Sequence, residues 1–126
     1  MIYGVGIDLV ENDRIEKIIA KWGGKFLERV FCENEIKYCA RHVQFSLHYA
    51  ARFAAKESFL KALGIGMGRG VHLKDVEVTH DDQGKPSILA HNQAAFQLKK
   101  NKIAKIHLSI THTRTYAAAF LILEKG

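Results

Sequence analysis

The chain has 126 residues, of which 48% are hydrophobic and 25% are charged, and it contains one proline. This composition excludes an intrinsically disordered chain and predicts one globular domain over residues 1–126. A net charge of +6 favours a polyanionic partner such as nucleic acid, a phosphate-rich cofactor, an acidic protein or a membrane surface. A soluble protein with an ordinary basic surface is the alternative.

The first expected elements are a strand over residues 2–10 and a helix directly after it. The strand is rich in β-branched residues and is interrupted by one acid, Asp8. Asp13, with Glu16 three residues later, has the pattern of a helix N-cap with a capping box. The helix is expected to end at the Gly-Gly pair that follows it. Its apolar residues recur at i, i+3, i+4 and i+7, which predicts one buried face: Ile15, Ile18, Ile19 and Trp22.

Two more helices are expected in the first half of the chain. The first covers residues 33–42, and the second is a long helix that runs from a cap at Ser46 to Gly64. Four glycines between residues 64 and 70 indicate a loop after it.

The second half of the chain has the pattern of strands around one helix. Residues 71–80 and 86–90 alternate in polarity and are separated by an Asp-Asp-Gln-Gly turn, which predicts a hairpin. A helix over residues 91–101 precedes strands over residues 103–111 and 116–123. This order predicts an α+β fold with helices packed on a largely antiparallel sheet.

Glu57 and Lys61 are the most informative pair of the long helix. They are four residues apart and therefore share one face. From spacing alone a surface ion pair is the favoured interpretation, and a metal ligand beside a phosphate-binding cation is the alternative. Asp8 leaves a similar choice, because an acid in an apolar strand lies in water at the strand end, pairs with a Lys or Arg, or binds Mg²⁺. Glu57 is the natural second carboxylate for such an ion.

Other motifs are weaker by themselves. The glycine-rich loop follows a helix and lacks the P-loop and Rossmann patterns, so a turn is the favoured interpretation and a close approach to a ligand the alternative. His112 ends a strand after Ser109 and Thr111, where it is either solvated or a phosphate donor or acid–base group. The histidines form no HxxxH or HxH pair, which disfavours a zinc enzyme.

Four segments of the chain together carry a family resemblance. They are Gly-Ile-Asp-Leu-Val-Glu at 6–11 with Arg14-Ile15, Arg-Phe-Ala-Ala-Lys-Glu at 52–57 with Lys61-Ala62, Gly-Ile-Gly at 64–66, and Ser-Ile-Thr-His at 109–112 with Tyr116-Ala117. In order and spacing they resemble holo-(acyl carrier protein) synthase, the short bacterial type of 4′-phosphopantetheinyl transferase. The resemblance covers essentially the whole chain, and the four segments in order are highly specific.

The resemblance implies an α+β subunit that forms a homotrimer with active sites at the subunit interfaces. It also implies a Mg²⁺-dependent reaction, in which the 4′-phosphopantetheine group of coenzyme A moves to a serine of apo-acyl carrier protein. Adenosine 3′,5′-bisphosphate is the other product, and the reaction would support fatty acid biosynthesis. The attacking serine belongs to the partner, so the lack of an obvious nucleophile in this chain is expected.

The same resemblance implies roles for individual residues. Asp8 and Glu57 should hold Mg²⁺, and Lys61 should contact the phosphates, so these three are the expected catalytic residues. The proton of the attacking serine goes to Glu57 or to a metal-bound water. Further contacts to coenzyme A are expected from Arg52, Lys61, Gly64, Gly66 and His112. Arg52 lies about 140° around the helix from Glu57, which favours a site assembled between subunits.

Arg14, Lys17 and Lys21 form a basic face on the first helix. Acyl carrier proteins are acidic, so this face is the expected docking surface, and an ordinary solvated face is the alternative. The chain departs from the family at Ile65, where threonine is frequent and could donate a hydrogen bond to coenzyme A. Residues 41–45 also contain less lysine than many relatives.

Two other function classes remain open at this stage. A nucleic-acid-binding module would need exposed aromatics between basic residues on a strand face, whereas Trp22, Phe53 and Phe59 have helix-core spacing. The second is a non-catalytic coenzyme A-binding protein. Two cysteines without a CxxC pattern, no signal peptide and no long apolar run predict a cytoplasmic protein that does not enter a membrane. The family resemblance and the helix-core spacing of the aromatics predict that it does not bind nucleic acid.

Overall fold

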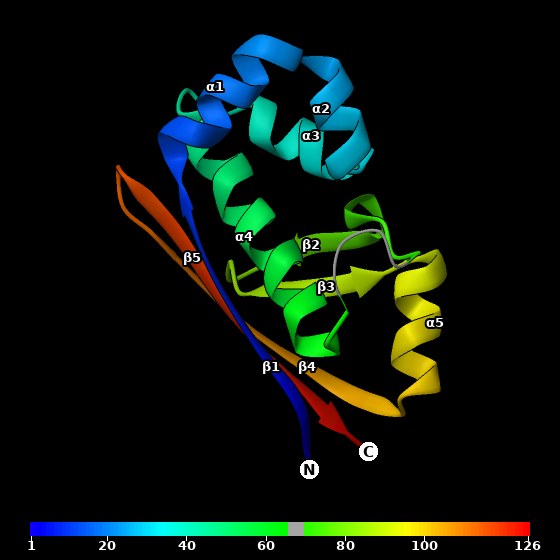
Figure 1. The fold of residues 1–126 in the computed structure, drawn as a ribbon. Coiled ribbons are helices and arrows are strands. Elements are labelled where there is room, and N and C mark those ends of the chain that lie inside the picture. Colours follow the sequence, from blue (N-terminus) through cyan, green and yellow to red (C-terminus); the bar gives the residue numbers. More distant parts are fainter. Residues whose placement is uncertain (66–69) are drawn as a thin grey trace.

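The computed structural model describes residues 1–65 and 70–126 of the chain (Figure 1). In chain order the elements are β1 (Ile2–Glu11), α1 (Asn12–Trp22), α2 (Gly24–Val30), α3 (Glu33–Ala40), α4 (Phe45–Leu63), a 3₁₀ turn (Leu73–Asp75), β2 (Val76–His80), β3 (Pro86–Ala90), α5 (Asn92–Lys100), β4 (Ile103–His112) and β5 (Tyr116–Lys125). The predicted α+β class with antiparallel sheets is confirmed. Helix α2 and the 3₁₀ turn were not predicted.

The strands form two antiparallel sheets, one with the order β1-β5-β4 and the other with the pair β2-β3. In the larger sheet Asp8 lies opposite Ala119 of the central strand β5. Burial alternates along β5, where Ala117, Ala119, Leu121 and Leu123 are buried and the residues between them are partly or fully exposed. One face of this sheet therefore packs on the core and the other is open to solvent.

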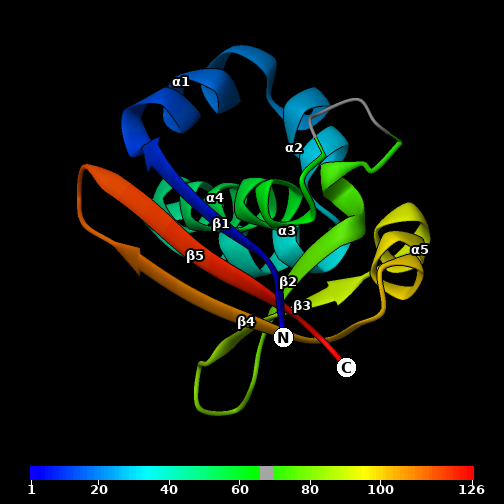
Figure 2. The ribbon, with the colours of Figure 1, turned by 60° about the horizontal axis from the view of Figure 1, so that its bottom comes forward.

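Helix α4 is the centre of the fold. It packs against β1 and β5 and also contacts α1, α3 and β2. Figure 2 shows the helix lying along the inner face of the three-stranded sheet, with the N- and C-termini close together on neighbouring strands. Because almost every residue after Tyr49 in the helix is buried, α4 has no polar stripe of the usual amphipathic kind.

Two glycines allow β1 to lie directly on α4. A Cβ atom at Gly4 would overlap the carbonyl oxygen of Ala62, and one at Gly6 would overlap the carbonyl oxygen of Ser58. Glycine is therefore required at both positions for the backbone of the strand to approach the helix. Asp8 continues the same face of the strand, because side chains two residues apart point the same way.

A buried ion pair joins α4 to α3 and β2. Lys56 Nζ lies 2.7 Å from Oε1 of Glu35, and both side chains are essentially inaccessible to solvent. Lys56 also donates to the carbonyl oxygens of Leu73 and Val76, and Glu35 accepts from the backbone N–H of Val78. All the polar atoms of the pair thus have partners, as a buried charge requires.

The two predicted helix N-caps, Asp13 and Ser46, are wrong. Strand β1 continues to Glu11, so α1 begins at Asn12 and Asp13 lies in its first turn, without a capping hydrogen bond from the N-cap side chain. The Asn12 amide instead donates to the carbonyl oxygens of Thr113 and Arg114 in the β4–β5 turn. The long helix begins at Phe45 after an N-cap at Gln44, so Ser46 is within the helix.

The other boundaries lie close to the predicted ones. Helix α1 ends at Gly23, which has a positive φ of 54°, and the β2–β3 hairpin forms as expected. Its first strand is shorter than predicted because residues 73–75 form the 3₁₀ turn. Residues 66–69, and with them the predicted role of Gly66, lie outside the described residues.

Candidate active site

Asp8, Glu57 and Lys61 come together where β1 crosses α4. Lys61 Nζ lies 3.0 Å from Oδ1 of Asp8, and it also donates to the carbonyl oxygen of Ile7 at 3.0 Å. The side chain of Asp8 is 16% exposed and that of Lys61 is 54% exposed. Lys61 therefore pairs with the strand carboxylate, and the surface pair with Glu57 that spacing alone favoured does not form.

Glu57 is the third member of this group, and its surroundings destabilise the ionised form of its carboxylate. Its pKa is raised, first by partial burial and then by the negative charge of Asp8, while Lys61 and Arg14 act in the opposite direction. Two carboxylates that repel one another next to a cation form a site that a positively charged ligand stabilises. Because the charge of Arg14 acts on the pKa of Glu57, the first turn of helix α1 also lies near this group.

The donor set fits Mg²⁺. This ion binds through one or two protein carboxylates and takes its other ligands from water and substrate phosphates. Asp8 and Glu57 could supply the two carboxylates. Across residues 1–65 and 70–126, no three His, Cys, Asp or Glu side chains gather to hold a metal by themselves.

Arg52 belongs to a second group on another face of α4. Its side chain is 3% exposed, and its guanidinium carbon lies 4.2 Å from the ring centroid of Tyr38. It donates to the carbonyl oxygen of His48 at 3.4 Å and lies 3.3 Å from Nδ1 of His80. The buried Nε atom has no hydrogen-bond partner within the described part of the chain.

His112 reaches the same group from the end of β4. Its ring centroid lies 6.2 Å from that of His48, which is one helical turn before Arg52. The structure therefore brings Arg52 and His112 into one cluster, separate from Asp8 and Glu57. No hydrogen bond or ion pair between described residues joins the two groups.

Several members of the second group were missed from the sequence. Tyr38, His42, His48 and His80 come from α3, the following loop, α4 and the end of β2. Each is an isolated residue in the sequence with no motif around it. The only available signal was the number of histidines, seven in 126 residues, and it does not indicate which of them meet.

Gly64 and Ile65 have local roles after α4. Gly64 adopts the left-handed conformation with φ of 79°, and its N–H donates to the carbonyl oxygens of Leu60 and Lys61. This N–H is therefore used by the helix end. Ile65 packs against the hydrophobic core, which gives a reason for an apolar residue at this position.

The basic face of α1 is exposed at all three predicted positions, Arg14, Lys17 and Lys21. Trp22, which was predicted to be buried, is 54% exposed, because the chain turns at Gly23 and the indole ring lies at the groove between α1 and α2. This groove has a volume of about 540 Å³ and is lined by Ile18, Trp22, Lys25, Phe26 and Arg29. It combines apolar and basic side chains next to the basic face.

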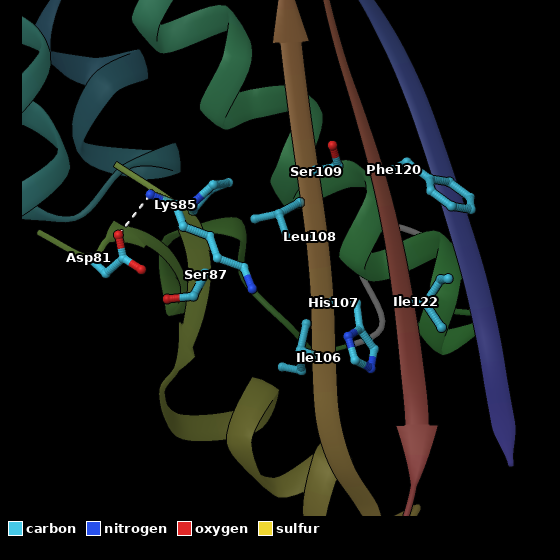
Figure 3. A pocket seen from close by; sticks show the side chains of 10 residues that line it. Asp81, Lys85, Ser87, Ile106, His107, Leu108, Ser109, Phe120 and Ile122 are labelled. Atoms are coloured by element: carbon cyan, nitrogen blue, oxygen red, sulfur yellow. Dashed lines mark hydrogen bonds between the residues drawn. The ribbon is translucent and has the colours of Figure 1, made fainter. Parts of the chain in front are cut away.

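A further cavity of about 450 Å³ lies between the β2–β3 hairpin and the larger sheet. Figure 3 shows Ile106 and Leu108 of β4 pointing toward Lys85 and Ser87 on the hairpin side, with Phe120 on the neighbouring strand. Phe120 lies on the exposed face of the sheet. The cavity is therefore continuous with that face.

Comparisons with known proteins identify the family. The model of the 4′-phosphopantetheinyl transferase superfamily matches residues 4–121. The chain belongs to this superfamily. The holo-[acyl-carrier-protein] synthase of Syntrophus aciditrophicus (strain SB) is 51% identical over 124 residues, covering 98% of this chain and 97% of that protein. The predicted family and the prediction of an enzyme, a phosphopantetheinyl transferase, are confirmed.

Solved structures of this superfamily have the same fold. The holo-[acyl-carrier-protein] synthase from Neisseria meningitidis matches with a TM-score of 0.92 and 32% identity, covering 99% of this chain and 100% of that chain. The enzyme from Bacillus anthracis str. Ames, solved in complex with CoA (3′,5′-ADP), matches with a TM-score of 0.83 and 38% identity, covering 100% and 99%. Among the described residues, no helix has the length and apolar character to cross a membrane.

Proposed function

We propose that the protein transfers the 4′-phosphopantetheine group of coenzyme A to a serine of apo-acyl carrier protein. The products are holo-acyl carrier protein and adenosine 3′,5′-bisphosphate. One observation carries the proposal: Asp8, Glu57 and Lys61 meet between β1 and α4 in a chain that is 51% identical to a holo-[acyl-carrier-protein] synthase.

Asp8 and Glu57 are the proposed Mg²⁺ ligands. The ion would bind the pyrophosphate of coenzyme A and neutralise charge that develops on it during phosphoryl transfer. Lys61 lies 3.0 Å from Asp8 with half of its side chain exposed, so its ammonium can turn toward a phosphate oxygen. Phosphoryl transfer depends mainly on positioning and charge stabilisation, and these residues supply both.

Glu57 is also the proposed acceptor of the proton from the attacking serine. A Mg²⁺ ion on Glu57 would lower the pKa of this carboxylate, so a water molecule on the ion is the alternative proton acceptor. Arg14, near enough to lower that pKa, would hold the carboxylate in place when the carrier protein arrives. The nucleophile itself comes from the partner.

Coenzyme A would lie across two subunits of a homotrimer. Arg52 and His112 form a group separate from Asp8 and Glu57, and we propose that they bind a phosphate of the coenzyme A whose pyrophosphate lies on the neighbouring subunit. The proposed contact surface is the outer face of the larger sheet. Val5, Ile7 and Leu9 are 50%, 64% and 64% exposed there and Phe120 is 43% exposed, a continuous apolar area of the kind that marks an interface.

The acyl carrier protein would dock on α1 and α2. Arg14, Lys17 and Lys21 provide positive charge for an acidic partner. The neighbouring groove adds Trp22 and Phe26 between Lys25 and Arg29, and aromatic anchors beside basic side chains are typical of binding hot spots. Because Arg14 lies near Glu57, a partner on this face would present its serine to the proposed active site.

Mass spectrometry of the carrier protein tests the transfer directly. The protein is incubated with coenzyme A, Mg²⁺ and apo-acyl carrier protein, and the carrier should gain one phosphopantetheine group. Asp8→Ala and Glu57→Ala should abolish the gain, and chelation with EDTA should stop it. Glu33→Ala, at a carboxylate of α3 that is 81% exposed and outside the site, is the matched control. Coenzyme A binding without any adduct would contradict the transfer and favour a non-catalytic binding protein.

We further propose that the reaction serves fatty acid biosynthesis in the cytoplasm. Cys32 and Cys39 are free thiols, as expected for a reducing compartment. Loss of holo-acyl carrier protein and of newly made fatty acids after depletion of the protein in cells would support this role. Unchanged fatty acid synthesis would contradict it.

A further inference from the structure

Residues 99–105, where α5 passes into β4, form a basic segment that the proposed reaction does not use. The segment contains no acid and no arginine, and four of its residues are exposed lysines: Lys99, Lys100, Lys102 and Lys105. Lysines so close in sequence repel one another. Their positive charge therefore favours an anionic partner over an empty surface.

The fold adds a fifth lysine to this segment. Lys125 lies opposite Ile103 in the larger sheet, and the N–H of the residue after it donates to the carbonyl oxygen of Lys102 at 3.1 Å. Figure 1 shows the end of α5, the start of β4 and both termini together, at the end of the molecule opposite α1 and α2. The five lysines thus form one basic patch on the side away from the proposed docking face for the carrier protein.

Most of the charge of the basic patch is not paired with a carboxylate in the described part of the chain. Lys105 lies opposite Glu124, but Oε1 of Glu124 lies 2.8 Å from Nε2 of His107. At the other end of α5, two carboxylates bond to the residues that begin the helix, Asp75 to Asn92 and Glu77 to His91. The helix therefore has its acidic neighbours at its start and the lysines at its end.

Fold stability does not explain all of these lysines. Lysines in the last turn of a helix stabilise its dipole, which gives a structural reason for Lys99 and Lys100. Lys102 lies beyond the helix with a φ of 59°, in the left-handed region that favours glycine or asparagine. A lysine at this position costs stability, so its charge needs another reason.

An exposed aromatic side chain lies on the same face of α5 as two of the lysines. Phe96 is 55% exposed, and it precedes Lys99 and Lys100 by three and four residues, which is about one helical turn. Ala94 and Leu98 pack on the core from the other side of the helix. A phenyl ring next to ammonium groups on an exposed helix face is typical of a helix that lies on an anionic membrane surface.

We propose that the basic patch binds the surface of an anionic lipid bilayer, with Phe96 among the headgroups. Binding of this kind needs no membrane-spanning helix. Lysine suits a diffuse anionic surface, whereas recognition of nucleic acids relies more on the planar guanidinium of arginine. Each lysine near such a surface strengthens binding about fivefold, so five together favour an anionic over a neutral bilayer by on the order of a thousandfold. The carrier-protein face on α1 and α2 would stay free.

Co-sedimentation with lipid vesicles tests the proposal. The protein should bind vesicles of phosphatidylcholine that contain about 30% phosphatidylglycerol and not vesicles of phosphatidylcholine alone, and about 1 M salt should release it. Lys99→Gln combined with Lys100→Gln should weaken binding about 25-fold. Phe96→Ser should also weaken it, because the ring no longer enters the headgroup layer.

Lys102→Gly separates the charge of the patch from the stability of the fold. It should weaken vesicle binding about fivefold, while the midpoint of urea denaturation stays the same or rises, because glycine suits the left-handed backbone. Lys37→Gln combined with Lys74→Gln is the matched control. It also removes two exposed lysines, which lie together beside α3 and outside the patch, and it should bind vesicles as the wild-type protein does.

The outcomes separate this inference from the proposed function, because all these variants should retain transfer to a carrier protein in solution. Equal binding to anionic and neutral vesicles, no binding to anionic vesicles, or an equal loss in the matched control would overturn the membrane role and leave the transfer reaction intact. Tighter binding to double-stranded DNA than to the anionic vesicles at the same salt concentration would overturn the choice of lipid and assign the patch to a nucleic acid.

Discussion

The Lys61 ammonium lies 3.0 Å from Oδ1 of Asp8, and this contact joins the last turn of α4 to the middle of β1. It exists because Gly4 and Gly6 let the strand lie directly on the helix. Glu57, one turn earlier, has no such partner among the described residues, and its pKa is raised. The protein therefore has one carboxylate that is paired with an ammonium and, beside it, one whose negative charge is unfavourable, and these are the two proposed Mg²⁺ ligands.

Glu57→Gln should lower the transfer activity without lowering the stability of the fold. At pH 7 the substitution removes a partly buried charge that Asp8 repels, so thermal unfolding without metal should occur at the same temperature or about 2 °C higher. Because the folded carboxyl titrates at higher pH than the unfolded one, any such gain should disappear as the pH falls toward 4. Transfer activity should fall at least about a hundredfold. An active variant with lowered stability would contradict the assignment.

Gly6→Ala should damage both fold and activity. The new Cβ atom would overlap the carbonyl oxygen of Ser58, so β1 must move away from α4 and carry Asp8 with it. We expect a loss of about 2–3 kcal/mol in unfolding free energy, measured by urea denaturation, and a large loss of transfer. Gly24→Ala is the control, because nothing lies within 4 Å of its Cβ position and alanine favours a helix. Equal effects of the two substitutions would refute this role for Gly6.

Lys56→Met should be one of the most destabilising single changes in the chain. It leaves the buried carboxylate of Glu35 and the carbonyl oxygens of Leu73 and Val76 without their donor. Removal of one member of a buried ion pair typically costs about 3–5 kcal/mol. Replacing both charges, as in Lys56→Met with Glu35→Leu, should restore part of this loss. Urea denaturation at one fixed protein concentration provides the measurement.

Lys37→Met is the matched control for that experiment. Lys37 and Glu33 also form an ion pair, at 3.1 Å, but their side chains are 72% and 81% exposed. A solvated pair of this kind contributes about 0.5 kcal/mol or less. Equal losses of unfolding free energy in Lys37→Met and Lys56→Met would contradict the claim that burial makes the Lys56–Glu35 pair important for stability.

Stability should decrease as the pH falls below neutral, and His48 should account for part of the decrease. Its pKa is about 4 in the folded protein and 6.5 in the reference state. Between these values the unfolded chain binds a proton that the folded chain does not, so acidification favours unfolding. After allowance for solvent screening we expect about 1 kcal/mol from this residue between pH 7 and pH 4. His48→Gln should flatten the dependence, and an unchanged slope would contradict it.

Ile7→Asp should dissociate the proposed homotrimer. Ile7 lies on the outer face of β1 and is 64% exposed, so a charge there disrupts an interface without entering the core. Light scattering should show a trimer for the wild-type protein and a monomer for the variant, with loss of transfer. Leu89→Asp, on an apolar residue of β3 that is 51% exposed, should remain trimeric. A wild-type monomer with full activity would contradict a site shared between subunits.

Local sequence patterns predicted most of the elements but not how they begin. The spacing of apolar residues that distinguishes a strand from a helix is visible within a few residues of sequence. The hairpin and the end of α1 at Gly23 likewise depend on residues that are adjacent in the chain. The Asp13 cap was wrong because β1 continues to Glu11 and Asn12, at the start of α1, donates to a turn about a hundred residues away. Trp22 has helix-core spacing, yet its exposure depends on the path of the chain after Gly23.

The sequence alone determined the α+β class and the family, and it predicted the three residues of the proposed site that meet between β1 and α4. Asp8 is informative because an acid is costly in an apolar strand, and Glu57 and Lys61 share one helical face whatever surrounds them. Only the tertiary structure decided that Lys61 pairs with Asp8, that Glu35 neutralises Lys56, and that His42 and His48 stack beside Arg52. Those contacts join residues far apart in the chain, and their energies depend on burial and on neighbouring charges, which exist only once the chain has folded.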